Sequence, residues 1–213
     1  FERVRARQAM AHLAPLGIDR DSLATVAENM AEARKALNWF TYLAARDIVR
    51  MQLGDVVIDR GGYRSLPAEI QRRVMAHALS WIGGTRYPPR RKPLKEMVAA
   101  ALSGVGMTLH GCRLLPGHRE IRITREYAAV AGLRGPVSAL WDGRWRFLGP
   151  AGQPRLQVAA LGEAGLTQCP DWRDAGLPHA SMLGCPAVWD GNEVLAAPLA
   201  GIGPGWRQIL TRD

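Results

Sequence analysis

The sequence has few cysteines and no long apolar run, and we expect no secretory leader. Its three cysteines, Cys112, Cys169 and Cys185, are odd in number and far apart among 213 residues. That pattern argues against a disulfide framework and favours a reducing compartment. No apolar stretch approaches the ~18 residues that span a bilayer. We therefore expect a cytoplasmic protein without a membrane partner.

Motifs of catalytic and metal sites are also missing. His110, Cys112 and His118 lie close together in sequence, but a structural zinc site needs four ligands and no C-x-x-C accompanies them. The chain lacks G-x-x-x-x-G-K-[ST], H-E-x-x-H and G-x-S-x-G. We therefore predict no metal, no cofactor and no catalytic residue within this chain.

What is present is the composition of a folded protein. Hydrophobic residues make up 47% and charged residues 22%, close to globular averages. The length suits one large domain or two small ones with a real core. The chain opens without Met, at Phe1, in the middle of a helical pattern. We expect it to be a piece of a longer protein.

Positive charge is concentrated in one third of the chain. The net charge is +9. Residues 61–130 hold twelve basic and four acidic side chains, net +8, whereas residues 1–60 are at +1 and residues 131–213 are neutral. A localised basic block of this kind is typical of a protein that binds a polyanion.

The first 130 residues predict helices with a small β layer. Helical periodicity extends over residues 21–54, a second helix starts at residue 65 and ends at Gly83-Gly84, and a third starts near Pro93. Residues 55–59 read as a strand, and residues 107–126 as a hairpin. The apolar positions of the first helix are Leu23, Val26, Ala27, Met30, Leu37, Phe40, Ala44, Ile48 and Met51.

The remaining residues predict a second module. Asp142-Gly143 and Asp190-Gly191 each suit a two-residue hairpin turn between strands. Gly- and Pro-rich connections place a boundary near residues 131–136. We predict an α+β fold, with a helical domain and small β layer over residues 1–130 and a small α+β module over residues 131–213.

The segment "GGTRYPPRRKP", residues 83–93, combines three prolines with four cations. Proline fixes φ and stiffens the loop, so the like charges repel unless an anion meets them. A solvated loop is the plainest alternative. The absence of acidic residues from Arg72 to Lys95 favours a phosphate partner instead.

We favour nucleic acid over an anionic membrane, because no helix has a basic face opposite a broad aromatic one. The predicted RNA-binding residues are Arg86, Arg90, Arg91, Lys92, Lys95, Arg113, Arg122 and Arg125.

Several segments, in order, resemble one enzyme family. These are "FERVRARQAMAHLAPLGI", "LPAEIQRRVMAHALSWIGG", "TRYPPR", "TLHGCRL", "WDGRW" and "GLPHASMLGCPAVWDGNEVLAAPLAG". They are similar to the C-terminal part of the bacterial tRNA(Ile)-lysidine synthetases, which are PP-loop ATP pyrophosphatases. The resemblance covers essentially the whole chain. The family's S-G-G-x-D-S signature, which belongs to an N-terminal catalytic domain, does not occur in it.

The resemblance implies an ATP-dependent ligase that modifies an isoleucine tRNA. The missing domain would bind ATP, adenylate C2 of the wobble cytidine and let the lysine amine displace AMP. The present region would hold the tRNA body, and Arg3, Arg5 and Arg7 would face the catalytic domain or the RNA. Many members carry lysines in the last module, where this chain has Arg173 but no lysine. We therefore expect the main contact on the central block.

Two other readings stay open at this point. The chain is alternatively a stand-alone, non-enzymatic RNA-binding or adaptor domain, or a protein-interaction module whose basic block meets an acidic partner. The oligomeric state, a monomer or a homodimer, is also open.

Overall fold

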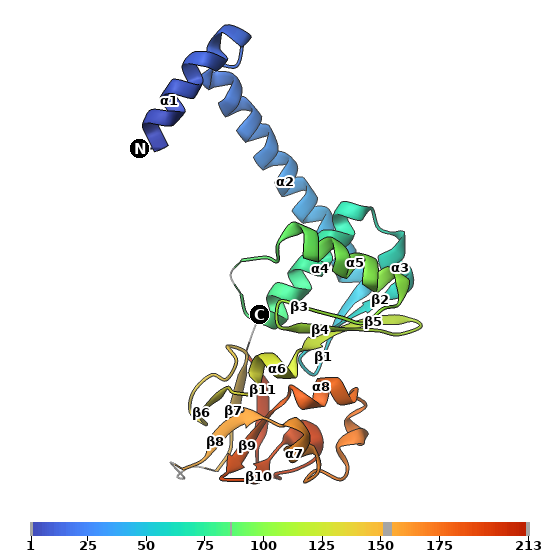
Figure 1. The fold of residues 1–213 in the computed structure, drawn as a ribbon. Coiled ribbons are helices and arrows are strands. Elements are labelled where there is room, and N and C mark those ends of the chain that lie inside the picture. Colours follow the sequence, from blue (N-terminus) through green and yellow to red (C-terminus); the bar gives the residue numbers. More distant parts are fainter. Residues whose placement is uncertain (1, 86, 151–154, 212–213) are drawn as a thin grey trace. The chain divides into compact units, whose positions relative to one another are not determined.

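The computed structural model describes residues 2–85, 87–150 and 155–211. It confirms the α+β class: most of the helical residues come first, and every paired strand in its small sheets is antiparallel (Figure 1). The chain forms two compact units, residues 1–44 and 45–213. The predicted boundary near residues 131–136 lies inside the second unit and stays a prediction.

The first unit is helical and buries almost nothing. It contains α1 (Glu2–Leu13), the 3-10 helix η1 (Ala14–Leu16) and most of α2 (Arg20–Ile48). The carboxylate of Asp19 accepts the backbone N–H of Ser22 at 2.8 Å and so caps the start of α2. Among the described residues of this unit only Thr41 is buried. The apolar positions Leu23, Val26, Met30 and Phe40 are exposed.

The long helix is shorter than its periodicity predicts. It ends at Ile48, and the next residues form β1 (Val49–Gln52), which pairs with β2 (Asp55–Asp59). Leu53 and Gly54, with φ of 50° and 92°, make the turn. A side chain at position 54 would overlap the indole of Trp145. Strand pairing therefore overrides helical periodicity at residues 49–52.

A five-stranded sheet follows, in the order β1-β2-β5-β4-β3. Its other strands are β3 (Met107–Leu109), β4 (Cys112–Pro116) and β5 (Glu120–Arg125). The predicted first hairpin strand is in fact two strands, because His110 and Gly111 have φ of 60° and 68° and form a tight turn.

Two long helices pack on this sheet, α4 (Ala68–Gly83) and α5 (Arg91–Ser103). Both were predicted, and each ends at a glycine in the left-handed conformation. The short helix α3 (Arg60–Ser65) precedes them, and the Asp59 carboxylate accepts the N–H of Gly62 and caps it. The core of this layer comes from Val56, Ile58, Ile70, Val74, Met75, Leu79, Ile82, Leu94, Met97, Leu114, Ile121 and Ile123.

The C-terminal residues form two small sheets and short helices. One sheet has the order β10-β9-β8-β6 and the other pairs β11 with β7. The strands are β6 (Arg134–Pro136), β7 (Trp145–Leu148), β8 (Gln157–Ala160), β9 (Pro186–Asp190), β10 (Glu193–Ala196) and β11 (Arg207–Leu210). The helices are α6 (Tyr127–Val130), α7 (Gly162–Leu166), η2 (Trp172–Ala175), α8 (His179–Leu183) and η3 (Pro198–Ala200). Asp142 and Gly143 both have positive φ, as the predicted turn requires, but the predicted strand before them is reduced to an isolated bridge between Trp141 and Trp145.

Within the part of the chain that the structure describes, no helix has both the length and the apolar character needed to cross a bilayer.

Candidate nucleic-acid interface

The first turns of α5 carry four exposed cations, Arg90, Arg91, Lys92 and Lys95. We call them the α5 cluster. Arg90 is the N-cap residue, makes no side-chain capping bond, and the first turn contains no acidic residue. None of the four forms an ion pair with another described residue. Proline conformation explains why the helix starts here: Pro93 lies in the first turn, where its missing N–H costs no bond.

This placement of charge is unfavourable for the isolated protein. A helix N-terminus carries about half a positive charge, so cations in the first turn each cost roughly 0.3–1 kcal/mol. Arg91 and Lys95 are also four residues apart on one helix face, where like charges repel by about 0.2–0.5 kcal/mol. An anion at this place would relieve both effects.

A shallow pocket of about 390 Å³ adjoins the α5 cluster. It is lined by Glu69, Arg72, Pro88, Pro89 and Arg91. The buried Pro89 holds the loop against the protein. Arg72, from α4, was not among the predicted site residues, because it lies nearly twenty residues before the α5 cluster in the sequence.

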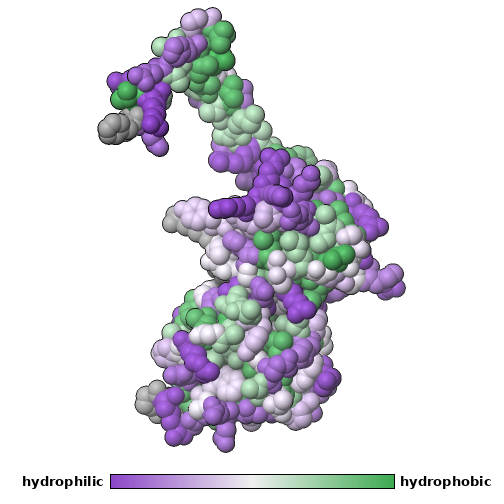
Figure 2. Space-filling view, in the orientation of Figure 1, coloured by the Kyte–Doolittle hydropathy of each residue, from purple (hydrophilic) through white to green (hydrophobic). Residues whose placement is uncertain are grey.

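The one carboxylate of this pocket is already neutralised. Arg72 donates to Glu69 at 2.5 and 2.8 Å, and Arg73 donates to it at 2.8 Å. The hydrogen bond from Arg72, assisted by Arg73, lowers the pKa of Glu69 to about 2. Glu69 is therefore already paired with Arg72 and does not neutralise Arg91 on the other side of the pocket. Figure 2 shows hydrophilic side chains gathered over this helical layer.

Two other predicted residues are not part of the α5 cluster as defined here. Arg86 lies outside the described residues, and nothing is assigned to it. Arg113 is exposed on β4 between the buried Cys112 and Leu114. Because Cys112 contacts the Leu79 carbonyl of α4 through its sulfur, alternation along the strand turns Arg113 to the face opposite the helices.

Arg122 is engaged inside the protein. Its guanidinium donates to the Asp55 carboxylate at 2.9 Å and to the Gln52 side-chain oxygen at 2.6 Å. The hydroxyl of Ser181, on α8, donates to the same carboxylate at 2.6 Å. Burial raises the pKa of Asp55, while Ser181 and Arg122 oppose that rise.

Arg125 is engaged in the same way. It binds Asp142 with both arms of its guanidinium, at 2.9 Å each. The buried Arg144 also reaches Asp142, at 3.4 Å, and donates to the Gly54 carbonyl at 3.1 Å. Asp55, Arg122, Arg125, Asp142 and Arg144 form a charged seam between the five-stranded sheet and the C-terminal residues.

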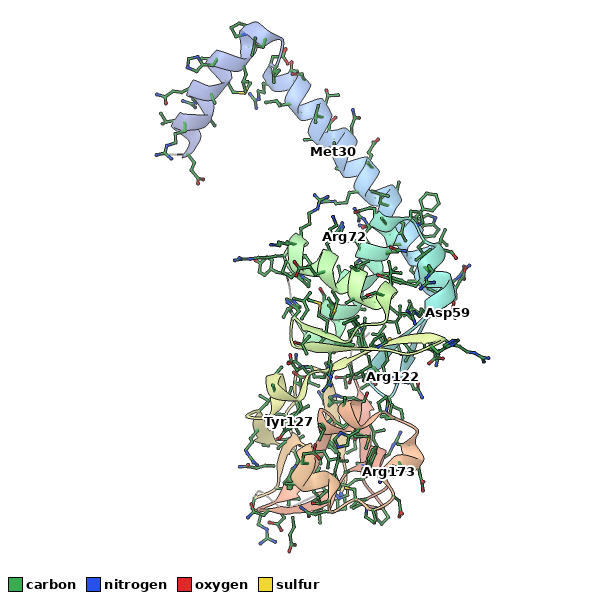
Figure 3. All side chains as sticks on the ribbon, turned by 45° about the vertical axis from the view of Figure 1, so that its right-hand side comes forward. Met30, Asp59, Arg72, Arg122, Tyr127 and Arg173 are labelled. Carbon is green, nitrogen blue, oxygen red and sulfur yellow. The ribbon has the colours of Figure 1, made fainter. Side chains whose placement is uncertain are left out.

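The seam holds the guanidinium groups of Arg122 and Arg125, two of the predicted RNA-binding residues, inside the protein. Their side chains are only 12% and 13% exposed, and each already has a carboxylate partner. Figure 3 labels Arg72 in the helical layer and Arg122 at the sheet, away from that layer's outer surface. No sequence pattern identifies these pairs, because Asp55 and Arg122 are 67 residues apart.

The described residues form neither a metal-binding cluster nor a reactive thiolate. No three His, Cys, Asp or Glu side chains in residues 2–85, 87–150 and 155–211 gather closely enough to hold a metal ion. The three cysteines are buried free thiols. Burial raises the pKa of Cys112 and of Cys185 to about 12, so neither is a thiolate nucleophile at neutral pH.

Comparison with known proteins adds the family. No protein-family model matches the chain. However, the chain is 50% identical over 210 residues to the tRNA(Ile)-lysidine synthase of Ruegeria pomeroyi. The chain is similar along nearly its whole length to part of that synthase. The match covers 99% of the chain and 50% of the relative, so the chain spans about half the length of that synthase. The predicted family resemblance is thereby confirmed.

Proposed function

We propose that this chain is the tRNA-holding part of a tRNA(Ile)-lysidine synthase and that the α5 cluster contacts the phosphates of the RNA. The observation that carries the proposal is a set of four exposed, adjacent cations that no described carboxylate neutralises, in a homologue of such a synthase. The whole protein would be a cytoplasmic, ATP-dependent ligase that joins lysine to the wobble cytidine of an isoleucine tRNA.

Catalysis is assigned to a domain outside this chain. The residues present do not form the S-G-G-x-D-S loop, so we place no ATP contact and no bond-making step on them. Their contribution is to bind and orient the tRNA body. Arg and Lys contacts to phosphate supply affinity without base recognition, so the selection would come from the shape of the folded RNA.

The physical argument is electrostatic. Each phosphate neutralised by a protein cation releases condensed counterions, which makes binding weaken as salt rises. Four to five contacts predict a slope of log affinity against log salt of roughly −3 to −4.5. The RNA would also offset the repulsion between Arg91 and Lys95 and the unfavourable charge at the start of α5.

The test is a triple variant, Arg90→Gln/Arg91→Gln/Lys92→Gln, titrated with isoleucine tRNA at several salt concentrations. We expect about 100-fold weaker binding at low salt, at roughly 1 kcal/mol for each exposed contact, and a slope that is shallower by about 2–3.

The matched control removes three exposed arginines of the C-terminal sheets, Arg134→Gln/Arg146→Gln/Arg207→Gln. It changes the net charge equally and leaves the α5 cluster intact. Equal tRNA affinity of the triple variant and the unaltered chain would refute the proposal. Preferential binding of an acidic protein over tRNA at equal salt would instead support a protein-interaction module.

A further inference from the structure

A second basic pocket lies at the other end of α5. It has a volume of about 300 Å³ and is lined by Arg60, Gly61, Arg64 and His118. Arg60 and Arg64 belong to α3, and His118 belongs to the turn between β4 and β5. Nothing in the proposed α5 contact uses these residues.

The two arginines of this pocket are held close together. The Nη2 atoms of Arg60 and Arg64 donate to one acceptor, the Leu102 carbonyl of α5, at 2.9 and 3.1 Å. The Nη1 atom of Arg60 donates to the Gly117 carbonyl at 3.0 Å. Both guanidinium groups are thereby fixed by backbone atoms, and neither forms an ion pair with a described residue.

Two carboxylates come from the adjoining strands. Glu120 pairs with Arg50 at 2.7 Å, whereas Asp59 accepts the N–H of Gly62 and keeps its negative charge. The carbonyl end of α5 contributes about half a further negative charge, and the two full positive charges of Arg60 and Arg64 still outweigh this sum. The pocket therefore keeps a net positive charge after its neighbours are counted.

Hydrogen-bond donors also remain in excess. A guanidinium has five N–H groups; Arg64 uses one of them on the Leu102 carbonyl, and its side chain is exposed. The Nε atom of Arg60 is buried and has no acceptor among the described residues. Capping the end of α5 accounts for the bonds to Leu102 but not for this surplus of charge and donors.

We infer that this pocket binds a phosphate group of the same folded RNA that contacts the α5 cluster. Eleven helical steps separate Arg91 from Leu102, about 17 Å along the α5 axis at 1.5 Å per residue. Two cationic sites that far apart contact different segments of the RNA backbone, so they fix its direction as well as its position. This inference rests on the proposed function and adds a second contact between the chain and the RNA.

The test compares tRNA binding by the unaltered chain with binding by Arg64→Gln/His118→Gln. Both positions are exposed, and Arg60 is left in place to keep its backbone bonds. We expect 3- to 10-fold weaker binding and a salt slope shallower by about 0.7–0.9, the value for one lost phosphate contact. The control His12→Gln/Arg146→Gln removes the same side-chain types from other exposed positions and should change neither quantity.

The outcomes separate this inference from the proposed function. If the unaltered chain binds no tRNA, both are overturned. If Arg91→Gln weakens binding and Arg64→Gln/His118→Gln does not alter the salt slope, only the second contact is overturned.

Inorganic phosphate, titrated alone at constant ionic strength, distinguishes the source of the anion. One outcome is that phosphate binds with a Kd below about 1 mM, that Arg64→Gln/His118→Gln abolishes this binding, and that the variant leaves the salt slope of tRNA binding unchanged. This outcome would assign the pocket to a free anion and overturn the RNA contact. If the variant makes the salt slope of tRNA binding shallower and the unaltered chain does not bind free phosphate in this way, the RNA contact is supported.

Discussion

The α5 cluster and the charged seam both contain arginines, but the surroundings of these arginines are opposite. At the start of α5 the cations are exposed, adjacent to one another and without carboxylate partners among the described residues. In the seam, Arg122, Arg125 and Arg144 are nearly buried and bind Asp55 or Asp142. Local net charge therefore does not identify a binding surface; the partner of each guanidinium does.

The largest expected effect comes from removing the charge of Asp142. In Asp142→Asn the turn is kept, because Asn also tolerates a positive φ, but Arg125 and Arg144 lose their carboxylate. Leaving buried charges unpaired costs about 3–5 kcal/mol, so the free energy of unfolding in urea should fall by that amount.

Asp190→Asn is the matched control for that change. Asp190 also precedes a turn glycine and pairs with Arg155, whose side chain is 72% exposed. An exposed pair contributes about 0–1 kcal/mol. Similar losses in the two variants would contradict the distinction between buried and exposed pairs.

Next in size is Arg122→Gln, at a position predicted from sequence to bind RNA. It should lower the free energy of unfolding by about 3 kcal/mol at pH 7, because the buried Asp55 carboxylate loses its cation. The salt slope of tRNA binding should not change. A shallower slope with unchanged stability would return Arg122 to the interface.

The same variant has a definite pH dependence. Burial raises the pKa of Asp55, so the folded state binds this proton more tightly than the unfolded chain does. The ionised Asp55 carboxyl therefore lowers the free energy of unfolding fully at pH values above its raised pKa. This loss becomes smaller as the pH falls through that pKa. Urea titrations at pH 7 and pH 5 should show a smaller difference between Arg122→Gln and the unaltered chain at pH 5.

A smaller effect with the opposite sign is expected at Arg91. Arg91→Glu should stabilise the protein by about 0.3–1 kcal/mol, since an anion replaces a cation in the first turn of α5. It should also weaken tRNA binding about 10-fold. Lys95→Glu should weaken binding similarly but stabilise less, because the dipole effect falls off beyond the first turn. Thermal unfolding and tRNA titration of both variants check this.

The smallest expected effect is the acid dependence of Glu69. Its pKa is lowered to about 2 by Arg72 and Arg73, so its contribution is present above about 4.5 and is lost as pH falls toward 2. The side chain is 39% exposed, and solvent screening limits the contribution to about 1 kcal/mol or less. Glu69→Gln should remove this part of the pH dependence of urea unfolding between pH 6 and pH 3.

Much of the fold was predictable because its signals are local. The helices α4 and α5 follow from apolar spacing, proline starts and glycine ends, and the strand at residues 55–59 follows from a run of β-branched residues. The errors lie where long-range pairing decides. Residues 49–52 have helical periodicity but pair with β2, and the turn at His110-Gly111 divides a segment that reads as one strand.

Part of the candidate site is likewise visible in the sequence, and part of it depends on long-range packing. The α5 cluster lies within six consecutive residues, so sequence alone locates it. Arg72 joins Arg91 around a pocket only because α4 and α5 pack side by side. Arg60 and Arg64 meet His118 only because α3 lies against the hairpin of β4 and β5.

The sequence by itself determined the class of fold, the resemblance to the lysidine synthases and the position of the positive block, because composition, periodicity and motif order can be read along the chain. Only the tertiary structure decided which arginines are available to a partner. The partner of an arginine depends on where two distant segments meet, as in the ion pair of Arg122 with Asp55 and the hydrogen bond of Arg144 with the Gly54 carbonyl, and no local pattern encodes that meeting.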